Sequence, residues 1–260
     1  MTFVSVVNSR QIFDNNFLAS PCLQGHHDHQ VLVQENFSSA AKAYNDAIRR
    51  SANDLIVFAH QDMVFPETWI PQLERALSLL EVSDPNWGVL GVYGITKEGN
   101  RWGHIYSNGM GVIGTPFEEP VPVQTLDEIV LIIRKSSGLT FDERLNHFHF
   151  YGADICMEAM KRGMKCYTIS VFSIHNTKFN LVLPKEFYDS YRTMKLKWKE
   201  VLPIETTCVR ISRSDFIMYR RRLREMYLRH ILRHEVGAER IPDGRRILES
   251  LRSIPGLPTT

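Results

Sequence analysis

The segment DLIVFAHQD, residues 54–62, joins an uninterrupted apolar run to three polar residues. Leu55–Ala59 is typical of a strand that is buried on both faces of a parallel sheet. Ligands of open α/β sheets collect beyond the carboxyl ends of the strands, so His60, Gln61 and Asp62 are expected at a binding edge. At that edge the Asp62 carboxylate is suited to hold a divalent metal on a phosphate. The alternative is that Asp62 only caps the turn into the next helix.

The segments around this strand alternate between strand and helix patterns. Strands are predicted for the short β-branched runs Phe3–Asn8 and Gln30–Glu35, and for the apolar run Trp87–Tyr93. Helices are predicted between them, over residues 38–50 and Glu67–Glu81, from apolar residues at helical spacing. This alternation implies an α/β domain with right-handed crossover connections.

The pattern changes after Gly94. The SNG triplet at Ser107–Gly109 predicts a hairpin turn, because Asn-Gly tolerates positive φ. Regular elements then resume, and they are predicted as a strand at Glu128–Arg134, a helix at Ile155–Arg162, a strand at Lys165–Val171 and a helix at Pro184–Trp198.

The composition is that of an ordinary globular chain. It has 260 residues, 43% hydrophobic and 23% charged, with a formal net charge of +2, which excludes collagen-like, disordered and disulfide-scaffold classes. No apolar run reaches the roughly 18–20 residues that cross a bilayer, and the first residues lack a secretory-signal pattern. The scattered cysteines are expected to be reduced thiols of a cytoplasmic protein, and they are Cys22, Cys156, Cys166 and Cys208.

Positive charge is concentrated near the C-terminus. Residues 210–252 contain twelve arginines and no lysine, against six acidic residues. Tyr219, Leu223, Tyr227 and Ile231 recur at helical spacing and form a stripe too long to leave in water. We expect the stripe to pack against the body and to contribute to a subunit or membrane-surface contact. The alternative is a plain helix with solvated arginines.

Three further features are candidates for chemistry from their positions. Asp154 precedes the helix expected at Ile155–Arg162, where it is either an N-cap or an ionised general base favoured by the helix dipole. His175 follows an apolar run, a position held more often by a structural histidine than by a ligand. The cluster His26–His29 is interpreted as a polar loop, because four adjacent residues cannot all converge on one metal ion.

Taken in order, these motifs resemble those of the family-2 kind of GT-A glycosyltransferases. The resemblance is to a bacterial branch in which HQD, residues 60–62, stands for the family's DxD. It covers roughly residues 3–180, and the matching stretches are VVN (6–8), SSAAKAYNDAI (38–48), DLIVFAHQD (54–62), FDERL (141–145), GAD (152–154), KRGMK (161–165) and His175. Two positions depart from the family's pattern, because His60 replaces the first Asp of DxD and Ala153 replaces the Glu of the ED motif.

The resemblance implies a fold and a set of site residues. The fold is a GT-A-like α/β domain over residues 1–205, with a mixed sheet flanked by helices, followed by an Arg-rich helical extension over residues 206–260. Asp154 would be the general base, and Asp62 and His175 would hold Mn²⁺ or Mg²⁺ on the donor diphosphate. The nucleotide-sugar contacts implied are Val7, Asn8, Glu35, Asn36, Asn45, His60, Gln61 and Asp62.

The function that the resemblance implies is inverting sugar transfer from a nucleotide-diphospho-sugar to an acceptor hydroxyl. Such chemistry needs a base for the attacking hydroxyl and neutralisation of the departing diphosphate. The acceptor would be a glycan, a lipid-linked molecule or a protein in bacterial surface polysaccharide or glycoconjugate synthesis. Further expectations are a cytoplasmic location with peripheral contact at the inner face of the membrane, a homo-oligomer, and no nucleic-acid partner.

Two rival functions are weighed against this one. A nucleotidyltransferase on a similar fold usually has a Gly-rich phosphate loop after the first strand, whereas this chain reads NSRQIFDNNF there. A protein without transferase activity could instead bind nucleic acid or a membrane surface through its arginines. The Arg-rich segment, however, matches no recognition motif and is interleaved with acids.

Overall fold

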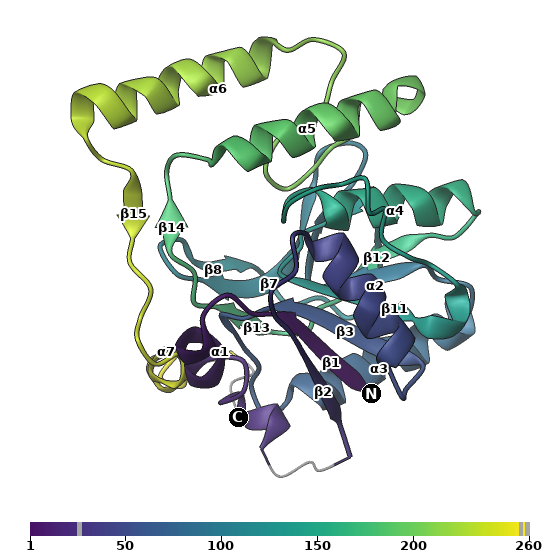
Figure 1. The fold of residues 1–260 in the computed structure, drawn as a ribbon. Helices are drawn as coiled ribbons and strands as arrows, with labels where there is room; N and C mark the ends of the chain where they lie inside the picture. Colours follow the sequence, from purple (N-terminus) through teal and green to yellow (C-terminus); the bar gives the residue numbers. More distant parts are fainter. Residues whose placement is uncertain (25–27, 255–256, 258–260) are drawn as a thin grey trace.

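A computed structural model gives the fold of the chain and describes residues 1–24, 28–254 and 257 (Figure 1). His26 and His27 of the histidine-rich loop lie outside the described residues. The main sheet has the order β2-β1-β3-β11-β5-β12-β9. Its strands are β1 (Thr2–Val6), β2 (Gln30–Gln34), β3 (Leu55–His60), β5 (Val89–Gly91), β9 (Val121–Val123), β11 (Val130–Arg134) and β12 (Cys166–Thr168).

The directions of the strands make this sheet mixed. β1 runs parallel to both β2 and β3, so the carboxyl ends of all three meet at one edge. β11 is antiparallel to β3 and to β5, while β12 is parallel to β5 and antiparallel to β9. The predicted α/β architecture with a mixed sheet flanked by helices is therefore confirmed.

A second sheet has the order β10-β6-β7-β13-β4, with β8 paired to β7. Its strands are β4 (Met63–Val64), β6 (Tyr93–Ile95), β7 (Arg101–Ser107), β8 (Gly111–Gly114), β10 (Thr125–Leu126) and β13 (Ser173–His175). The predicted hairpin joins β7 to β8, and Gly109 in its turn has φ of 83°. A side chain is strained at such a φ, which explains the Asn-Gly signal.

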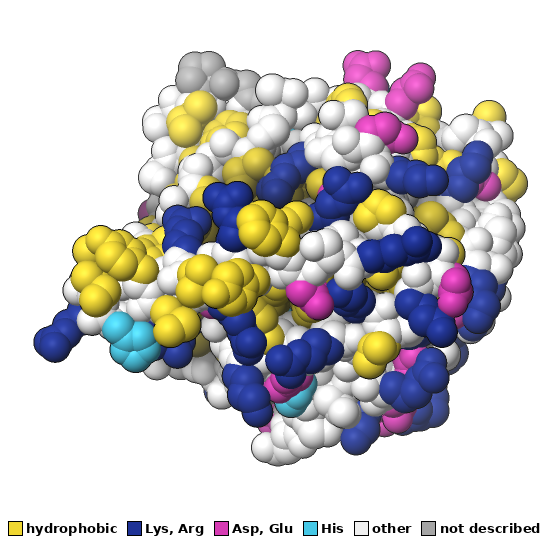
Figure 2. Space-filling view, turned by 90° about the horizontal axis from the view of Figure 1, so that it is seen from above, with side chains coloured by type: hydrophobic (Ala, Val, Ile, Leu, Met, Phe, Trp, Pro, Cys, Tyr) yellow, Lys and Arg dark blue, Asp and Glu magenta, His cyan; other side chains and the backbone are white. Residues whose placement is uncertain are grey.

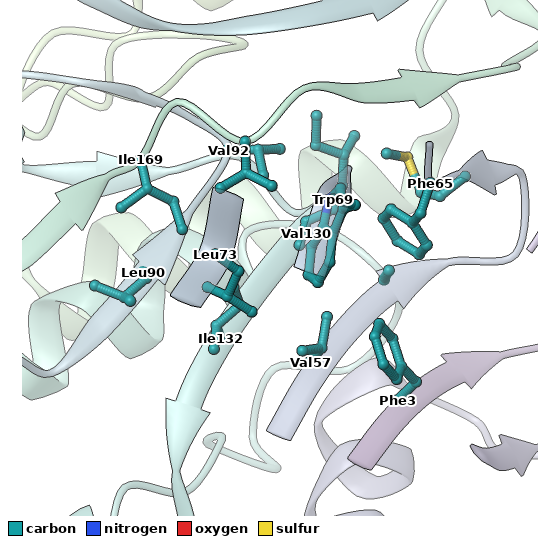
Figure 3. Close-up of a cluster of buried hydrophobic side chains, with 14 of the residues drawn as sticks. Phe3, Val57, Phe65, Trp69, Leu73, Leu90, Val92, Val130, Ile132 and Ile169 are labelled. Carbon is teal, nitrogen blue, oxygen red and sulfur yellow. The ribbon is translucent and has the colours of Figure 1, made fainter. Parts of the chain in front are cut away.

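Helices cover both faces of the main sheet, and they are α1 (Arg10–Asn15), α2 (Ala40–Arg50), α3 (Trp69–Ser83) and α4 (Tyr151–Lys161), with short 3₁₀ turns η1 (Pro21–Leu23) and η2 (Lys135–Ser137). On one face Trp69 and Leu73 of α3 pack against Val57 and Ile132 (Figure 3). On the other face the neighbouring strand residues Ile56 and Phe58 pack with α2 and α4. The run LIVFA is apolar throughout because β3 buries both faces, each large side chain contributing about 1.5–3 kcal/mol.

The start of α4 differs from the prediction. The helix begins at Tyr151, and its N-cap is Phe150, whose φ is 67°. Asp154 is consequently inside the first turn rather than at the N-cap position. The N-cap interpretation of Asp154 is wrong, because the sequence pattern placed the helix start four residues too late.

The C-terminal part crosses one end of the molecule and then returns to the body (Figure 1). Its elements are β14 (Phe179–Asn180), α5 (Lys185–Lys197), η3 (Lys199–Val201), α6 (Phe216–Tyr227), the π-helical turn η4 (Leu228–Leu232), β15 (Val236–Ala238) and α7 (Arg245–Leu251). β15 pairs with β14, and α7 packs against Val64, Phe172 and Ile174 of the body. The boundary at residues 205–206 stays a prediction.

The apolar stripe on α6 and η4 does not pack against the body as expected. Tyr219, Leu223, Tyr227 and Ile231 are 61%, 47%, 53% and 67% exposed. The helix instead turns a different side inward, where Glu225 accepts a hydrogen bond from Tyr188 of α5. Met218 is buried on the same inward side and packs with Tyr188 and Tyr191 of α5.

Candidate functional site

A cleft of about 680 Å³ lies where β1, β2 and β3 end, and we call it the first cavity. Much of its lining lies at or just beyond the carboxyl ends of these parallel strands, which is the edge where α/β sheets bind ligands, and Tyr44 of α2 and Tyr151 of α4 also contribute to it. The predicted nucleotide-sugar contacts that line it are Val7, Asn8, Glu35, Asn36, His60, Gln61 and Asp62. Residues that are dispersed in the sequence thus converge on one concave surface.

Gln61 fixes the shape of this edge. Its side-chain oxygen accepts hydrogen bonds from the backbone N–H groups of Asn8 and Ser9, each at 3.1 Å. Its amide nitrogen donates to Asn8 Oδ1 at 2.5 Å. The middle residue of HQD therefore ties the loop after β1 to the end of β3, and its role is to hold the cavity wall.

Asn45 lies apart from the first cavity. It is 8% exposed, and its amide donates to the carbonyl oxygen of Phe141 at 2.9 Å. Its side-chain oxygen accepts from the Phe141 N–H, also at 2.9 Å. Asn45 thus clamps the segment before α4 to α2, and its predicted contact with the nucleotide has no support from this position.

Three side chains converge as candidate metal ligands. His60, Asp62 and His175 each offer a ligand atom, and these atoms lie within 4.8 Å of one another. His175 reaches the site from β13, since its Nε2 is 3.4 Å from Asp62 Oδ1. A carboxylate is a ligand type that suits Mn²⁺ and Mg²⁺, and imidazoles are ligands that divalent transition metals accept. The donor set therefore fits the predicted metal, and it adds His60 to the pair expected from the sequence.

The charge state of Asp62 is set by its neighbours. Burial opposes ionisation, but the nearby His175, His60 and Arg240 act in the other direction and lower the pKa of Asp62 below its ordinary value. Arg240 Nη2 donates to Asp62 Oδ2 at 2.7 Å, and Arg240 Nε donates to the carbonyl oxygen of Asn176 at 2.9 Å. An arginine of the C-terminal extension is thus part of the site's electrostatics.

His60 connects the candidate metal site to α4. Its Nε2 lies 3.1 Å from the hydroxyl of Tyr151, the first residue of α4. Burial, and then the neighbouring His175, lower the pKa of His60, which favours the neutral imidazole that binds metals.

His60 also lines a second cavity of about 420 Å³, which contains His175, Asp127 and Glu128 on its polar side. Its apolar side includes Phe179 of β14, Val182 from the segment after β14, and Phe187 of α5. The two cavities share His60, so a molecule in each would meet at the candidate metal site.

Asp154 has a different setting, because it is 1% exposed and lines neither of these two described cavities. Lys197 donates to one of its oxygens at 2.8 Å and the Trp198 indole to the other at 2.7 Å. Lys197 also contacts Asp142 at 2.7 Å and Glu158 at 2.8 Å. The carboxylates form a second acidic cluster, and the Lys197 ammonium lies where a cation would. A base role for Asp154 remains a prediction.

Several of these residues are not visible as functional in the sequence. Arg240 and Lys197 lack a motif, and only the fold brings them to Asp62 and Asp154. Glu128 begins the predicted strand Glu128–Arg134, and its apolar neighbours conceal its place at the sheet edge. Asp127 and Glu128 come just before β11, which is antiparallel to β3. They therefore lie at the same edge of the main sheet as HQD, and acidic residues at such an edge are candidates for chemistry.

The structure thus defines an α/β protein with a mixed sheet, whose strand ends carry a cavity and a candidate metal site. Residues 2–197 match the Glycosyltransferase like family. The chain therefore belongs to this family, and the resemblance to family-2 glycosyltransferases is confirmed.

Individual relatives are distant. A protein of Fuscovulum blasticum named "ATP synthase subunits region ORF 6" is 24% identical over 169 residues, which cover 62% of this chain and 66% of that protein. TarS of S. aureus is 13% identical with a TM-score of 0.49, covering 87% of this chain and 43% of TarS. A mannosyltransferase of Pyrobaculum calidifontis, solved with GDP-Man and Mn²⁺, is 12% identical with a TM-score of 0.45, covering 99% and 76%. The chain thus spans less than half of TarS.

Proposed function

We propose that the protein is an inverting glycosyltransferase that moves a sugar from a nucleotide-diphospho-sugar to an acceptor hydroxyl. The observation that carries this proposal is the junction of the two cavities at His60, beside Asp62 and His175. The nucleotide would occupy the first cavity, the acceptor the second, and the transferred sugar the junction. In this arrangement both substrates would contact one charged centre.

The residues of the first cavity bind and orient the donor. Asn8, Glu35 and Asn36 present polar groups at the strand ends, while Val7 contributes an apolar wall. His60, Asp62 and His175 would hold Mn²⁺, which when bound neutralises the charge that develops on the departing diphosphate. Ordering these groups before reaction is the principal contribution that the fold makes to catalysis.

The second cavity fits an acceptor with both polar and apolar parts. Asp127, Glu128 and Lys178 lie on its wall together with Phe179 and Phe187. A lipid-linked or glycosylated acceptor would present a hydroxyl to the polar side and hydrophobic groups to the aromatic side. This pairing supports a role in the synthesis of a bacterial surface polysaccharide or glycoconjugate.

A membrane contact is proposed from the exposed face of α6. Figure 2 shows hydrophobic side chains lying among lysines and arginines on the side of the molecule that carries this helix. Phe216, Tyr219, Leu223, Tyr227 and Ile231 are exposed there. Arginines beside them, including Arg220 and Arg224, are exposed as well.

Apolar groups flanked by cations match an anionic lipid surface, which offers hydrocarbon below negative headgroups. Within the described residues, no helix is long and apolar enough to cross a bilayer. We therefore propose that α6 makes a peripheral contact with the inner face of the cytoplasmic membrane. The alternative is that the same face of α6 is the subunit interface of a homo-oligomer.

The arginines of the C-terminal part give little support to nucleic-acid binding. Several of them form ion pairs within the chain, namely Arg210 with Glu205, Arg221 with Glu225, Arg229 with Glu235, Arg240 with Asp62 and Arg245 with Asp243. Paired arginines have part of their charge neutralised and their side chains committed, so they attract phosphates less strongly.

The proposed function is tested with a panel of nucleotide sugars. Purified protein is heated with UDP-glucose, UDP-N-acetylglucosamine, UDP-galactose or GDP-mannose, each with and without Mn²⁺. One donor should raise the melting temperature in the presence of Mn²⁺, and saturation at 100 Kd adds about 2.7 kcal/mol of stability. That donor should then release its nucleoside diphosphate when acceptor glycosides are supplied. Stabilisation by free nucleic acid and by none of the donors would contradict the proposal.

A further inference from the structure

Two carboxylates face the second cavity from one short segment. Asp127 and Glu128 lie between β10 and β11, and both line this cavity together with His60 and His175. Each is partly exposed, so its side chain is accessible from the cavity. They are therefore placed where the acceptor of the proposed reaction would bind.

Glu128 is held at the beginning of α4. The backbone N–H of Gly152 donates to Glu128 Oε1 at 3.4 Å, and the backbone at Phe150 and Tyr151 also hydrogen-bonds the Glu128 carboxyl. The N-cap residue Phe150 itself makes no side-chain capping bond among the described residues. Glu128 thus reaches the helix from another element and has a fixed orientation, which a catalytic group requires.

Gly152 makes this approach sterically feasible. A Cβ at residue 152 would lie 2.9 Å from Glu128 Cγ and 3.1 Å from the carbonyl oxygen of Leu126. Atoms do not approach that closely without displacement, so any other residue at position 152 would move the Glu128 side chain. Gly152, the glycine of the GAD motif, therefore leaves the space that the Glu128 side chain occupies.

Tyr151 connects Glu128 to the candidate metal site. Its hydroxyl donates to the Glu128 carbonyl oxygen at 3.3 Å and lies 3.1 Å from His60 Nε2. The Tyr151 side chain therefore contacts both His60 and the backbone of Glu128, which lie on the two sides of the junction at which the sugar would be transferred. Asp154, by comparison, has both oxygens occupied by Lys197 and Trp198.

We infer that Glu128 is the general base of the proposed transferase and accepts the proton of the acceptor hydroxyl. The inference rests on the proposed function and replaces Asp154 in the role that the sequence suggested. As the acceptor oxygen forms its bond to the anomeric carbon, its proton passes to a Glu128 oxygen. The bond between that carbon and the diphosphate oxygen breaks, and its electron pair leaves with the nucleoside diphosphate.

The local environment suits this role. Burial, and then the neighbouring Asp127, raise the pKa of Glu128 well above its ordinary value, although the backbone N–H groups act in the opposite direction. A raised pKa makes the ionised carboxylate a stronger proton acceptor, and the backbone N–H groups at the start of α4 favour the ionised form that a base requires.

The test compares three matched variants with the wild type. Glu128→Gln keeps an oxygen that can accept from the start of α4 but removes the basicity. Asp127→Asn removes the other carboxylate of the same cavity, and Asp154→Asn removes the buried one. Each protein is assayed for donor binding by calorimetry with the UDP- and GDP-sugars named above. Each is also assayed for release of nucleoside diphosphate with p-nitrophenyl glycosides as acceptor probes.

Glu128→Gln should bind the donor as the wild type does and lose transfer by on the order of 10²–10⁴-fold. A fourth variant, Glu128→Ala, opens space at the carboxylate position, and formate, a small carboxylate, should restore part of its rate while leaving Asp154→Asn unaffected. Nearly full transfer by Glu128→Gln, or a larger loss in Asp127→Asn or Asp154→Asn, would overturn the assignment while the transferase stands. A wild type that binds and turns over none of the donors would overturn the proposed function and this assignment together.

Discussion

Arg240 and Asp62 form an ion pair of 2.7 Å between Nη2 and Oδ2, although 178 positions separate them in the chain. The pair links the C-terminal part of the chain to the edge where β3 ends. Asn176 reinforces it, because its carbonyl accepts from Arg240 Nε and its side chain binds the backbone at Ile241. Removing the C-terminal part would therefore alter the candidate metal site as well as the surface.

Replacing Arg240 should show that the candidate metal site depends on this ion pair. In Arg240→Gln the buried Asp62 loses its charged partner, and the free energy of unfolding should fall by about 1–3 kcal/mol. A bound divalent cation can replace the lost charge, so Mn²⁺ should raise the melting temperature of the variant more than that of the wild type. The measurement is thermal unfolding with and without Mn²⁺.

Arg245→Gln is the matched control, since Arg245 is exposed and pairs only with the nearby Asp243 among the described residues. It should respond to Mn²⁺ as the wild type does. An equal Mn²⁺ response in the Arg240 and Arg245 variants would show that Arg240 has no influence on the cation site.

Lys197 should be a centre of stability rather than of catalysis. Burial would lower its pKa, but Asp154, Asp142 and Glu158 raise it, so Lys197 is a cation throughout the neutral range. Lys197→Met leaves Asp154 buried without its partner and should cost about 3–5 kcal/mol at pH 7.

The loss of stability in Lys197→Met should become smaller as the pH falls. Burial raises the pKa of Asp154, and without Lys197 less opposes that rise. A carboxyl with a raised folded-state pKa binds more protons when folded, so the variant gains stability as the pH falls. The difference in melting temperature from the wild type should narrow between pH 7 and pH 5. Lys199→Met, which alters an exposed lysine of η3, should show no such trend, and a gap that widens on acidification would contradict this account.

The stripe on α6 predicts binding to anionic membranes. In the double variant Leu223→Glu/Tyr227→Glu, association with vesicles of phosphatidylglycerol and phosphatidylcholine should fall at least about tenfold, because apolar contact is lost and negative charge is added. Vesicle co-sedimentation at low and high salt measures this, with phosphatidylcholine alone as the reference.

Val82→Glu is the control for general surface charge, as Val82 is 88% exposed and lies on α3 rather than on α6. It should bind the vesicles as the wild type does. If the double variant binds equally well but changes from oligomer to monomer in light scattering, the face is a subunit interface and not a lipid surface.

Local sequence patterns predicted the helices and strands whose residue types follow directly from which side chains are buried. The run LIVFA of β3 is apolar because both of its faces are covered, and the Asn-Gly hairpin follows from backbone chemistry. The family resemblance also predicted seven of the residues that line the first cavity, and these lie at or after the ends of β1, β2 and β3.

The remaining features depend on contacts between distant segments. Asp154 has the position expected of a base in the chain order, yet α5 brings Lys197 and Trp198 against it. Glu128 resembles an ordinary strand residue until the fold places it over Gly152. Local propensity cannot reveal such pairings, since the partners are up to 178 residues apart and lack a shared motif.

The central claim is that the donor diphosphate binds at His60, Asp62 and His175, and titration calorimetry of a donor with and without Mn²⁺ tests it most directly. In the wild type, Mn²⁺ should strengthen binding of the donor identified by thermal shift. In Asp62→Asn, which keeps the size of the side chain and removes its charge, that strengthening should vanish, and in His175→Ala it should be reduced. If Asp62→Asn binds the donor with full Mn²⁺ dependence, the diphosphate lies elsewhere and the account is wrong.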